Sequence, residues 1–432
     1  YGSRSGGSSS YGSRSGGSSS YGSRPASNNR RSSKGSRGEN IDINRFIARA
    51  EVVTEKKEEV VKIDHKFSDF AFDEKLKEAI TKKGYITPTP IQDKVIPFIL
   101  KGRDVVGMAN TGTGKTGAFL LPLITKSRLI PTEKVLILAP TRELAIQIAD
   151  ELKEFTVNDH MHFACCVGGM HIGKQIDQLR RPNNFVIGTP GRVKDLIQRK
   201  MIDTSTFGTI VLDEADRMLD MGFAPQINKI LEKVPKGRQT LLFSATMPAA
   251  IVKIANTYMR TPLRIEVAPA GSAVTSVTQE IYFLERGQKL PLLSTIVKQY
   301  NGSILVFSRT KFGAKKIARD IRAMGVTATE IHSNRSLNQR LEALKGFKLG
   351  NYRVLVATDI AARGIDVTGI QLVINYDLPD QAEDYVHRIG RTGRASMTGH
   401  AISFATHDQR RDVNLIERLI QKQLPVAKLP ES

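Results

Sequence analysis

The segment at residues 109–116 carries the residue types best suited to chemistry in this chain of 432 residues. It reads Ala-Asn-Thr-Gly-Thr-Gly-Lys-Thr between a strand-like run and an apolar helix, which predicts a phosphate-binding loop. Its glycines let backbone N–H groups face phosphate oxygens at a helix N-terminus. We expect Lys115 to reach the β- and γ-phosphates and the Thr116 hydroxyl to coordinate Mg²⁺. The predicted nucleotide contacts of the loop are Thr111, Gly112, Thr113, Gly114, Lys115 and Thr116.

The acidic tetrapeptide at residues 213–216, Asp-Glu-Ala-Asp, follows the apolar run 209–212. We expect this run to form a buried parallel strand that places Asp213 beside the phosphate loop, where its carboxylate holds Mg²⁺ through water. Alone, the tetrapeptide also fits a solvated acidic turn. With the loop upstream and the segments 244–246 and 387–394 downstream, the order describes an ATP-driven motor with two halves.

The elements that must position these motifs alternate from Phe67 onward, with short apolar runs between longer amphipathic stretches. This alternation is typical of parallel sheets with helical crossovers. Strands are predicted at residues 104–109, 134–139, 163–167, 184–188, 209–213, 239–243, 279–284, 303–307, 327–331, 353–357, 372–376 and 399–404. The sequence predicts an α/β fold with two doubly wound parallel-sheet domains, at 64–267 and 277–425, joined by a linker at 268–276.

The composition narrows the class of protein. The net charge of +21 favours a polyanionic partner, and a generically basic, well-solvated surface is an equal alternative. The two cysteines, Cys165 and Cys166, are adjacent, which excludes a disulfide framework and indicates a cytoplasmic, reducing environment. No apolar run approaches membrane-spanning length. The chain begins at Tyr1 rather than Met, so the sequence does not decide whether a targeting segment precedes it.

Residues 1–40 form a low-complexity tail of Tyr, Gly, Ser and Arg, whose first ten residues repeat unchanged at 11–20. Such a composition cannot build a core, so we expect the tail to be disordered. Its Tyr and Arg side chains can stack on and pair with nucleic acid, and a purely solubilising role fits equally well. Residues 41–63 predict a short amphipathic helix or docking segment, whose purpose the sequence does not reveal.

Together these motifs resemble those of the DEAD-box family of ATP-dependent RNA helicases, over about residues 64–425. The matching segments are residues 84–92, 109–116, 140–145, 168–169, 189–192, 213–216, 244–246, 357–366 and 387–394. Residues 331–336 and 415–420 look most like the bacterial RhlE-like branch. The resemblance implies two RecA-like domains in tandem that close around ATP and RNA.

The resemblance also extends the predicted nucleotide site. Phe67 would stack on adenine, Tyr85 is a further predicted nucleotide contact, and Glu214 would activate the hydrolytic water. The Gln92 amide can donate to and accept from the adenine edge, which favours ATP over GTP. From the second domain, Asp366 would contact the ribose. The predicted catalytic residues are Lys115, Asp213, Glu214 and the arginine fingers Arg391 and Arg394, and the predicted interdomain coupling residues are Asp216, Ser244, Thr246 and His387.

RNA backbone contacts are implied for a set of residues in each domain. The set comprises Thr141, Arg142, Gly168, Gly169, Thr189 and Arg192 in the first domain and Arg309, Thr310, Arg340, Thr358 and Arg363 in the second. Backbone contacts carry little sequence information, so loose substrate choice is expected. The family usually shows Gly after His and then Gln, where this chain has Ser333 and Leu337, so we expect the second-domain grip to be weaker or to use different atoms.

The implied activity is local unwinding or remodelling of RNA duplexes and RNA–protein complexes, driven by ATP. Two alternatives are an ATP-dependent RNA clamp or condensate scaffold with little unwinding, and a DNA helicase. Ribosome-assembly or RNA-decay proteins are candidate partners, and no membrane association is expected. The sequence does not identify the RNA target, the pathway, the protein partners or the oligomeric state.

Overall fold

A computed structural model describes residues 63–110, 112–157, 161–267, 277–362, 370–393 and 399–429, together with the backbone of 48–49. Several predicted features lie outside these residues. They are the tail, most of the segment 41–63, the linker, and the site residues Thr111, Arg363, Asp366 and Arg394.

The first sheet is parallel throughout, and in the described chain it has the strand order β1-β8-β2-β7-β6-β3-β5-β4. Its strands are β1 (Ala48–Arg49), β2 (Val105–Met108), β3 (Lys134–Leu138), β4 (Phe163–Cys166), β5 (Phe185–Gly188), β6 (Phe207–Leu212), β7 (Gln239–Ser244) and β8 (Leu263–Glu266). All six runs predicted in this part form strands. Sequence reasoning missed β8, whose alternation of apolar and charged residues is too short to stand out.

The segment 41–63 was predicted to hold a helix or docking segment. Within it Ala48 and Arg49 form β1, which pairs in parallel with Leu263 and Arg264 of β8 at the edge of the sheet, and the choice between helix and docking segment for the remainder stays a prediction. The backbone of Ala48 and Arg49 is therefore extended, as pairing with a sheet edge requires.

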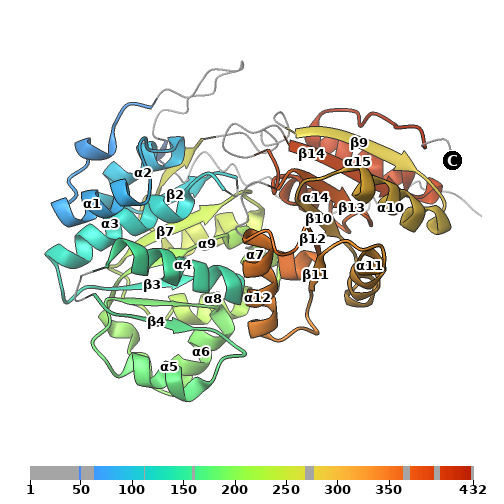
Figure 1. Cartoon of the computed structure of the whole chain (residues 1–432). Coiled ribbons are helices and arrows are strands. Elements are labelled where there is room, and N and C mark those ends of the chain that lie inside the picture. The colour runs from blue at the N-terminus through green and yellow to red at the C-terminus, as the bar shows by residue number, and fades with distance from the viewer. Residues whose placement is uncertain are drawn as a thin grey trace, which may run out of the picture. The chain divides into compact units, whose positions relative to one another are not determined.

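Helices cover both faces of the first sheet (Figure 1). They are α1 (Glu74–Lys82), α2 (Pro90–Leu100), α3 (Lys115–Leu129), α4 (Arg142–Phe155), α5 (Ile172–Leu179), α6 (Pro190–Gln198), α7 (Ala215–Asp220), α8 (Ala224–Leu231) and α9 (Ala249–Tyr258). One core contains Phe119 of α3 and Ile148 of α4, and a separate core contains Val193 of α6 and Ile251 of α9. Two cores on one parallel sheet define a doubly wound layer structure.

The second sheet is also parallel, with the order β11-β12-β10-β13-β14-β9. Its strands are β9 (Val277–Phe283), β10 (Ile304–Phe307), β11 (Ala328–Ile331), β12 (Val354–Ala357), β13 (Leu372–Asn375) and β14 (Gly399–Ala405). Its helices are α10 (Lys289–Gln299), α11 (Lys311–Ala323), α12 (Leu337–Lys348), α13 (Asp359–Ala362), α14 (Ala382–Ile389) and α15 (Arg410–Ile420). Helices α10 and α11 share one core, and α12, α14 and α15 share the other.

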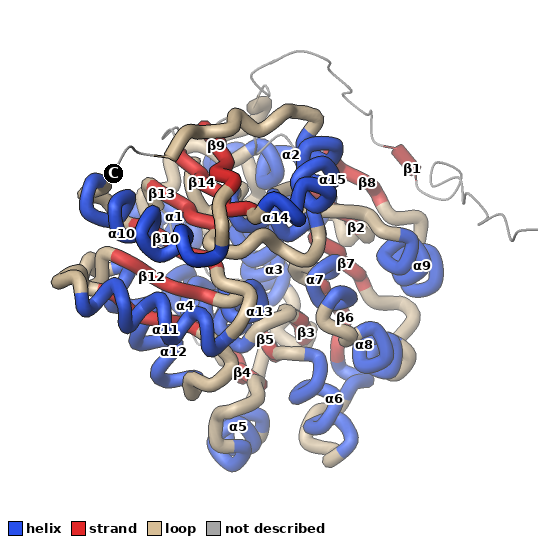
Figure 2. Tube along the Cα trace, turned by 90° about the vertical axis from the view of Figure 1, so that its right-hand side faces the viewer, coloured by secondary structure: helices blue, strands red, loops and turns tan. Residues whose placement is uncertain are grey.

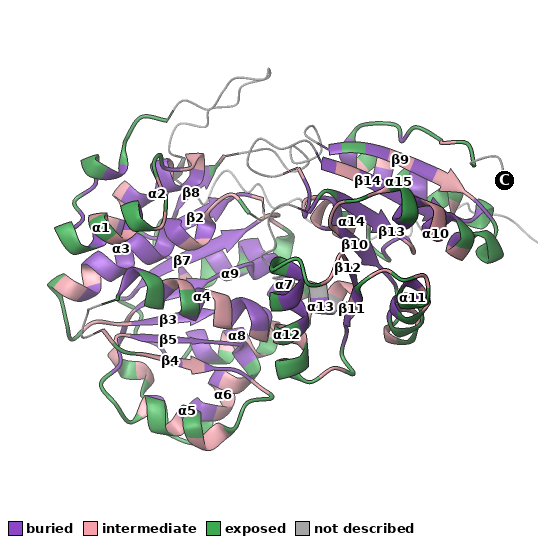
Figure 3. Ribbon diagram, viewed as in Figure 1, coloured by how far each residue is buried: buried purple, intermediate pink, exposed green. Residues whose placement is uncertain are grey.

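The strands of both sheets are largely buried, as Figure 3 shows by colour. Burial on both faces explains why the central strands are nearly continuous apolar runs in the sequence. Figure 2 distinguishes these strands from the helices that connect them. Short 3₁₀ turns lie at Phe67–Asp69, Thr204–Thr206, Arg286–Gln288 and His407–Gln409. No helix in the described ranges combines the length and apolar character needed to cross a bilayer.

The strand order of the first sheet decides which motifs meet. Parallel strands end at the same edge of a sheet, so neighbouring strands bring their following loops together. Strands β2, β7 and β6 are neighbours and lead into the phosphate loop, Ser244 and Asp213. Strands β3, β5 and β4 are the next neighbours and lead toward Thr141, Thr189 and Gly168. The phosphate loop, Ser244 and Asp213 therefore lie along the same sheet edge as the first-domain RNA residues Thr141, Thr189 and Gly168.

Candidate nucleotide and RNA sites

The phosphate loop turns into α3 through Gly114, whose φ of 86° favours glycine. A Cβ at Gly114 would lie 2.7 Å from the Gln92 side-chain nitrogen, so a larger residue would also collide with the wall behind the loop. The Lys115 ammonium is buried and donates to the Ala109 carbonyl at 2.7 Å. A buried cation at the N-terminus of a long helix is the charge arrangement that binds nucleotide phosphates.

Lys115 faces the carboxylates of the acidic tetrapeptide. Burial lowers the pKa of Lys115, and the charges of Glu214 and Asp213 act in the opposite direction. Burial raises the pKa of Asp213 to about 7, and the neighbouring charge of Glu214 adds to this rise while Lys115 opposes it. The approach of another cation would therefore stabilise the ionised form of Asp213 and lower its pKa.

Glu214 combines an unusual backbone with a buried partner. Its φ of 49° lies in the left-handed region, which is rare for a residue other than glycine. Its carboxylate lies 3.0 Å from the Arg217 guanidinium, and both side chains are almost inaccessible. Burial alone would raise the pKa of Glu214, but the charges of Arg217, Lys115 and Arg391 lower it below its ordinary value. Because Arg391 follows α14, the second sheet contributes to the charge balance at this carboxylate.

The donor set fits Mg²⁺ bound together with a nucleotide. The described residues contain no group of three or more His, Cys, Asp and Glu placed to hold a metal ion on their own. Mg²⁺ commonly uses one or two protein oxygens and completes its shell with phosphate and water. Asp213, with its raised pKa, and the half-buried Thr116 at the second position of α3 supply such oxygens.

Gln92 lies directly behind the phosphate loop and is buried. Its amide nitrogen donates to the Gly114 carbonyl at 3.0 Å, and its oxygen accepts from the Thr89 N–H at 2.9 Å. Phe67 is 6% exposed and its ring stacks on Tyr85, with ring centres 6.2 Å apart. The structure thus brings these predicted adenine contacts together and also gives Gln92 a structural bond to the loop. Their contacts with adenine stay a prediction.

Asp216 is the hub of a hydrogen-bond network that reaches the loop after β7. Its carboxylate accepts from the backbone N–H of Ala245 at 3.0 Å and from that of Thr246 at 2.9 Å. It also accepts from the Thr246 hydroxyl at 3.0 Å, while the Ser244 hydroxyl accepts from the Asp216 N–H at 3.3 Å. These contacts join the acidic tetrapeptide to the predicted coupling residues.

The predicted RNA residues of the first domain lie close together. The Arg142 guanidinium packs over Gly168 and Gly169, where a Cβ on Gly169 would overlap it. Gly169 also has a φ of 79°, so this close approach requires glycine on two grounds. Thr141 caps α4 and Thr189 precedes α6, while Arg192 donates to the Gln175 side chain at 3.0 Å.

The predicted RNA residues of the second domain divide into two groups. Arg309 and Thr310 follow β10, and Thr358 follows the neighbouring strand β12. Arg340 lies elsewhere: its guanidinium pairs with the buried carboxylate of Glu143 at 2.8 Å. The Arg340 side chain is only 12% exposed, so this ion pair competes with the predicted RNA contact.

His387 and Arg391 line a small pocket together with Arg217, Phe307, Asp359, Asp384 and Arg388. Burial and the Arg217 guanidinium lower the pKa of His387, so its neutral form is favoured. Arg388, which sequence reasoning missed, pairs with both carboxylate oxygens of Asp359 at 2.6 Å and donates to the Asn375 side chain at 3.1 Å. Arg388 lies on the buried face of α14 with Tyr385 and Ile389. This helical spacing is the sequence signal that could have marked Arg388 as a structural residue.

The comparisons with known proteins agree with this geometry. A family model described as DEAD/DEAH box helicase matches residues 89–254, and one described as helicase conserved C-terminal domain matches residues 288–396. The ATP-dependent RNA helicase CshA of Listeria monocytogenes is 41% identical over 367 residues, which is 84% of this chain and 71% of the relative. The RNA helicase CrhR of Synechocystis is 41% identical over 366 residues, covering 84% of this chain and 74% of the relative.

A plant relative and two solved structures extend the comparison. The DEAD-box ATP-dependent RNA helicase 30 of Arabidopsis thaliana is 42% identical over 82% of this chain and 62% of its own length. Dbp5 of S. cerevisiae bound to RNA and ADP BeF3 superposes with a TM-score of 0.76 at 28% identity, over 84% of this chain and 95% of that chain. A DEAD box protein from Methanococcus jannaschii gives a TM-score of 0.53 at 38% identity, over 84% of this chain and 99% of that chain.

These relatives establish the family and the fold of the chain, but they do not test its predicted placement in the RhlE-like branch. The predicted fold class of two RecA-like parallel-sheet domains is confirmed, while placement in the RhlE-like branch stays a prediction. Two family models and curated relatives above 40% identity agree with the motifs that the structure brings to one sheet edge. The chain belongs to the DEAD-box family of ATP-dependent RNA helicases.

Proposed function

We propose that this protein is an RNA-stimulated ATPase that locally unwinds or remodels RNA duplexes and RNA–protein complexes. One observation carries this function. Lys115, Asp213 and Glu214 are buried together at the end of one sheet, and the charge of Arg391 reaches Glu214 from the other domain. An ATP site that draws on residues of both domains can link hydrolysis to the arrangement of the domains.

The residues have distinct roles in this site. The phosphate loop and Lys115 bind the phosphates of ATP, and Thr116 and Asp213 would hold Mg²⁺, which neutralises phosphate charge. Glu214 orients the hydrolytic water and accepts its proton, because its lowered pKa keeps it ionised near neutral pH. Arg391 stabilises the charge that develops on the transferring phosphoryl group.

Three predicted site residues that lie outside the described ranges have proposed roles as well. Asp366 is assigned to the ribose, Arg394 to the phosphates and Thr111 to the loop, on the strength of the family motifs alone. Gln92 would read the adenine edge, with Phe67 and Tyr85 at its side.

RNA would lie along the edge formed by the ends of β3, β5 and β4 and continue onto the second domain. Arg142, above Gly168 and Gly169, offers a cation beside exposed backbone, and Arg309 offers another after β10. Such contacts address sugar and phosphate, so the protein would accept many sequences. A net charge of +21 supports binding to a polyanion of this kind.

The Asp216 network would transmit the state of the nucleotide to the RNA edge. Asp216 joins α7, next to Glu214, to the loop at Ser244 and Thr246. A change at the acidic tetrapeptide therefore reaches a second loop through buried hydrogen bonds, with His387 placed near the same carboxylate.

The decisive experiment compares ATP turnover and strand separation on the same substrates. ATP turnover with RNA and with DNA of equal sequence separates an RNA helicase from a DNA helicase. Release of a labelled strand from a short RNA duplex separates a helicase from an ATP-dependent clamp or scaffold. Turnover stimulated by RNA without strand release would favour the clamp.

The same proposal extends to location and partners. Residence in the cytoplasm is supported by the two free cysteines, Cys165 and Cys166. Ribosome-assembly or RNA-decay proteins are the candidate partners, and sequencing RNA crosslinked to the protein in cells would identify the pathway.

A further inference from the structure

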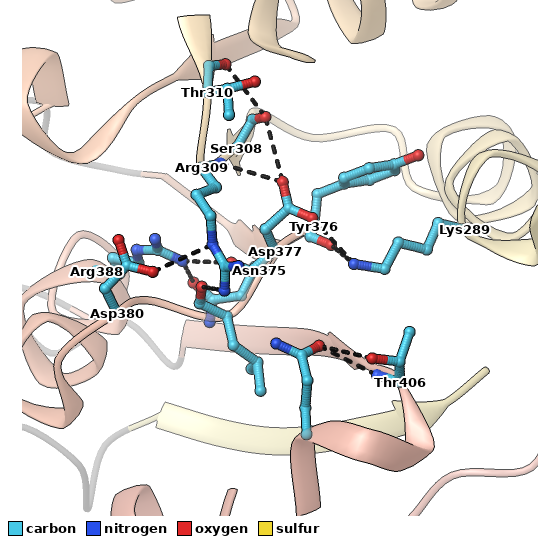
Figure 4. Close-up of polar contacts among 12 residues, drawn as sticks. Lys289, Ser308, Arg309, Thr310, Asn375, Tyr376, Asp377, Asp380, Arg388 and Thr406 are labelled. Carbon is cyan, nitrogen blue, oxygen red and sulfur yellow. Dashed lines mark hydrogen bonds and ion pairs between the residues drawn. The ribbon is translucent and has the colours of Figure 1, made fainter. Parts of the chain in front are cut away.

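A polar cluster joins the carboxyl ends of β10 and β13, which are neighbouring strands of the second sheet (Figure 4). Asp377, which follows β13, lies at its centre. One oxygen of the Asp377 carboxylate accepts from the Arg309 backbone N–H at 3.1 Å and from the Ser308 hydroxyl at 3.3 Å. The side chain thereby fixes the loop of residues 308–310, which contains two predicted RNA contacts.

The other carboxylate oxygen of Asp377 lies 3.0 Å from the Lys289 ammonium. Lys289 is the first residue of α10, is buried, and also donates to the Tyr376 carbonyl at 2.8 Å. Its ammonium lies 5.4 Å from the centre of the Tyr376 ring, which adds a cation–π contact. Burial would raise the pKa of Asp377, but Lys289 and the hydrogen bond from Arg309 lower it, so the carboxyl group stays charged.

The loop of residues 308–310 also contacts the start of α11 on the side away from Asp377. The Thr310 hydroxyl caps α11 by accepting from the Gly313 N–H at 2.9 Å. A Cβ at Gly313 would lie 2.6 Å from the Ser308 hydroxyl, so the loop packs closely against the start of α11. The loop is therefore bonded on both sides, and from it the half-exposed Arg309 guanidinium reaches the exposed Asp380 carboxylate at 3.2 Å.

We propose that Asp377, held by Lys289, is a positioning residue that presents Arg309 and Thr310 to RNA. This inference rests on the proposed function, because it assigns the loop to RNA. Asp377 acts through the loop backbone, and its contribution is to order the loop before RNA arrives. Preordering removes an entropic cost from binding, so its loss should weaken RNA affinity more than the chemistry of ATP hydrolysis.

The central test is Asp377→Asn, which keeps the shape of the side chain. Either orientation of the amide turns its NH₂ toward a donor, which is Lys289 on one side or Arg309 N–H on the other. We expect the RNA concentration for half-maximal ATPase stimulation to rise about fivefold or more, given the strength of charge-assisted hydrogen bonds. Turnover at saturating RNA and the KM for ATP should stay within about twofold of the parent, since the loop lies outside the ATP site.

One milder variant and one control guard against a folding defect. Ser308→Ala removes the hydroxyl that bonds Asp377 and the Thr310 carbonyl but leaves the Lys289–Asp377 pair intact, and a rise of about twofold to threefold in half-saturating RNA is expected. Asp412→Asn makes the same chemical change on an exposed position of α15 and should match the parent. Thermal unfolding of each full-length variant shows whether it is folded.

The outcomes separate the claims. A rise in half-saturating RNA with turnover preserved, graded from Ser308→Ala to Asp377→Asn, supports the positioning role. Half-saturating RNA unchanged in folded Asp377→Asn and Ser308→Ala overturns it, and so does a joint loss of turnover and ATP affinity, which indicates only a structural role. A parent protein whose ATPase ignores RNA would contradict the proposed function instead.

Discussion

The carboxylate of Glu214 and the guanidinium of Arg217 form a 3.0 Å ion pair inside the protein, one helical turn apart. The pair joins the proposed catalytic base to a residue that also lines the pocket of His387 and Arg391. The backbone of Glu214 lies in the left-handed region, which is strained for a residue other than glycine. Backbone strain of this kind commonly concentrates at active sites. The charge of Arg217 therefore helps set the proton affinity of the base.

Arg217→Met should shift the pH dependence of turnover. The pKa of Glu214 is lowered in the parent by Arg217, Lys115 and Arg391 against the effect of burial. Without Arg217 this pKa rises, so Glu214 becomes protonated at mildly acidic pH and can no longer accept a proton. We expect RNA-stimulated kcat to fall more at about pH 6 than at about pH 8, with the acidic limb moved upward relative to the parent. Arg217→Lys, which keeps a cation, should move that limb less. Identical pH profiles for all three proteins would show that the pair does not tune the base.

Arg391 and Arg388 should give opposite kinds of defect although they are one turn apart. Arg391→Ala should leave the protein folded and lower RNA-stimulated turnover by roughly 10³-fold or more, the scale typical of arginine fingers. Arg388→Met should unfold the protein at lower temperature, because it leaves Asp359 without its bidentate partner, at a cost of about 3–5 kcal/mol. Thermal unfolding and ATP turnover measured on both variants check this. Normal turnover in a folded Arg391→Ala variant would contradict the catalytic role.

Asp213 should make stability depend on pH. Its pKa of about 7 in the folded protein lies above the ordinary value of 3.8, so the folded state binds an extra proton between these values. This contribution to stability is present below about pH 4 and is lost as pH rises through about 7. Asp213→Asn, measured without Mg²⁺ or nucleotide, should therefore be more stable than the parent at about pH 8, by on the order of a few kcal/mol. The difference should shrink toward about pH 5. A difference that is constant with pH would refute the raised pKa.

Gln92→Ala should reduce the preference for ATP over GTP. An amide paired with adenine leaves unsatisfied groups when guanine enters, which costs roughly 1–3 kcal/mol. Because Gln92 also bonds Gly114, the variant should weaken both nucleotides to some extent. The ratio of the two dissociation constants is the relevant measurement. An unchanged ratio with both affinities reduced would leave Gln92 with its structural role alone.

Periodicity and motif spacing predict most of this fold. The twelve apolar runs from residue 104 onward all form strands, because parallel strands buried on both faces leave a strong apolar signal. Strand β8 escaped prediction because Leu263 and Ile265 alternate with charged residues over only four positions. The strand pairing of β1 with β8 depends on a tertiary contact with a sheet edge and has no local signature.

The sequence indicated which of the predicted site residues lie close together, but not which side chains they contact. Lys115, Asp213 and Glu214 come together as the motif order implies, because their strands are neighbours. The buried pairing of Arg340 with Glu143 links helices separated by almost two hundred residues, which spacing cannot reveal. Arg388 and Asp377 were missed for a related reason: their importance lies in the buried groups they bond rather than in the motif they belong to.

The most direct test of the central claim is steady-state ATP turnover by the full-length protein, measured alone, with single-stranded RNA and with DNA of the same sequence. Lys115→Ala serves as the matched inactive control, since it lacks the buried ammonium of the phosphate loop. We expect RNA to raise turnover by roughly tenfold or more and DNA to leave it close to the basal rate, because in the proposed mechanism RNA is what brings the second domain to complete the site. Equal stimulation by RNA and DNA, or a full rate without either, would contradict the account.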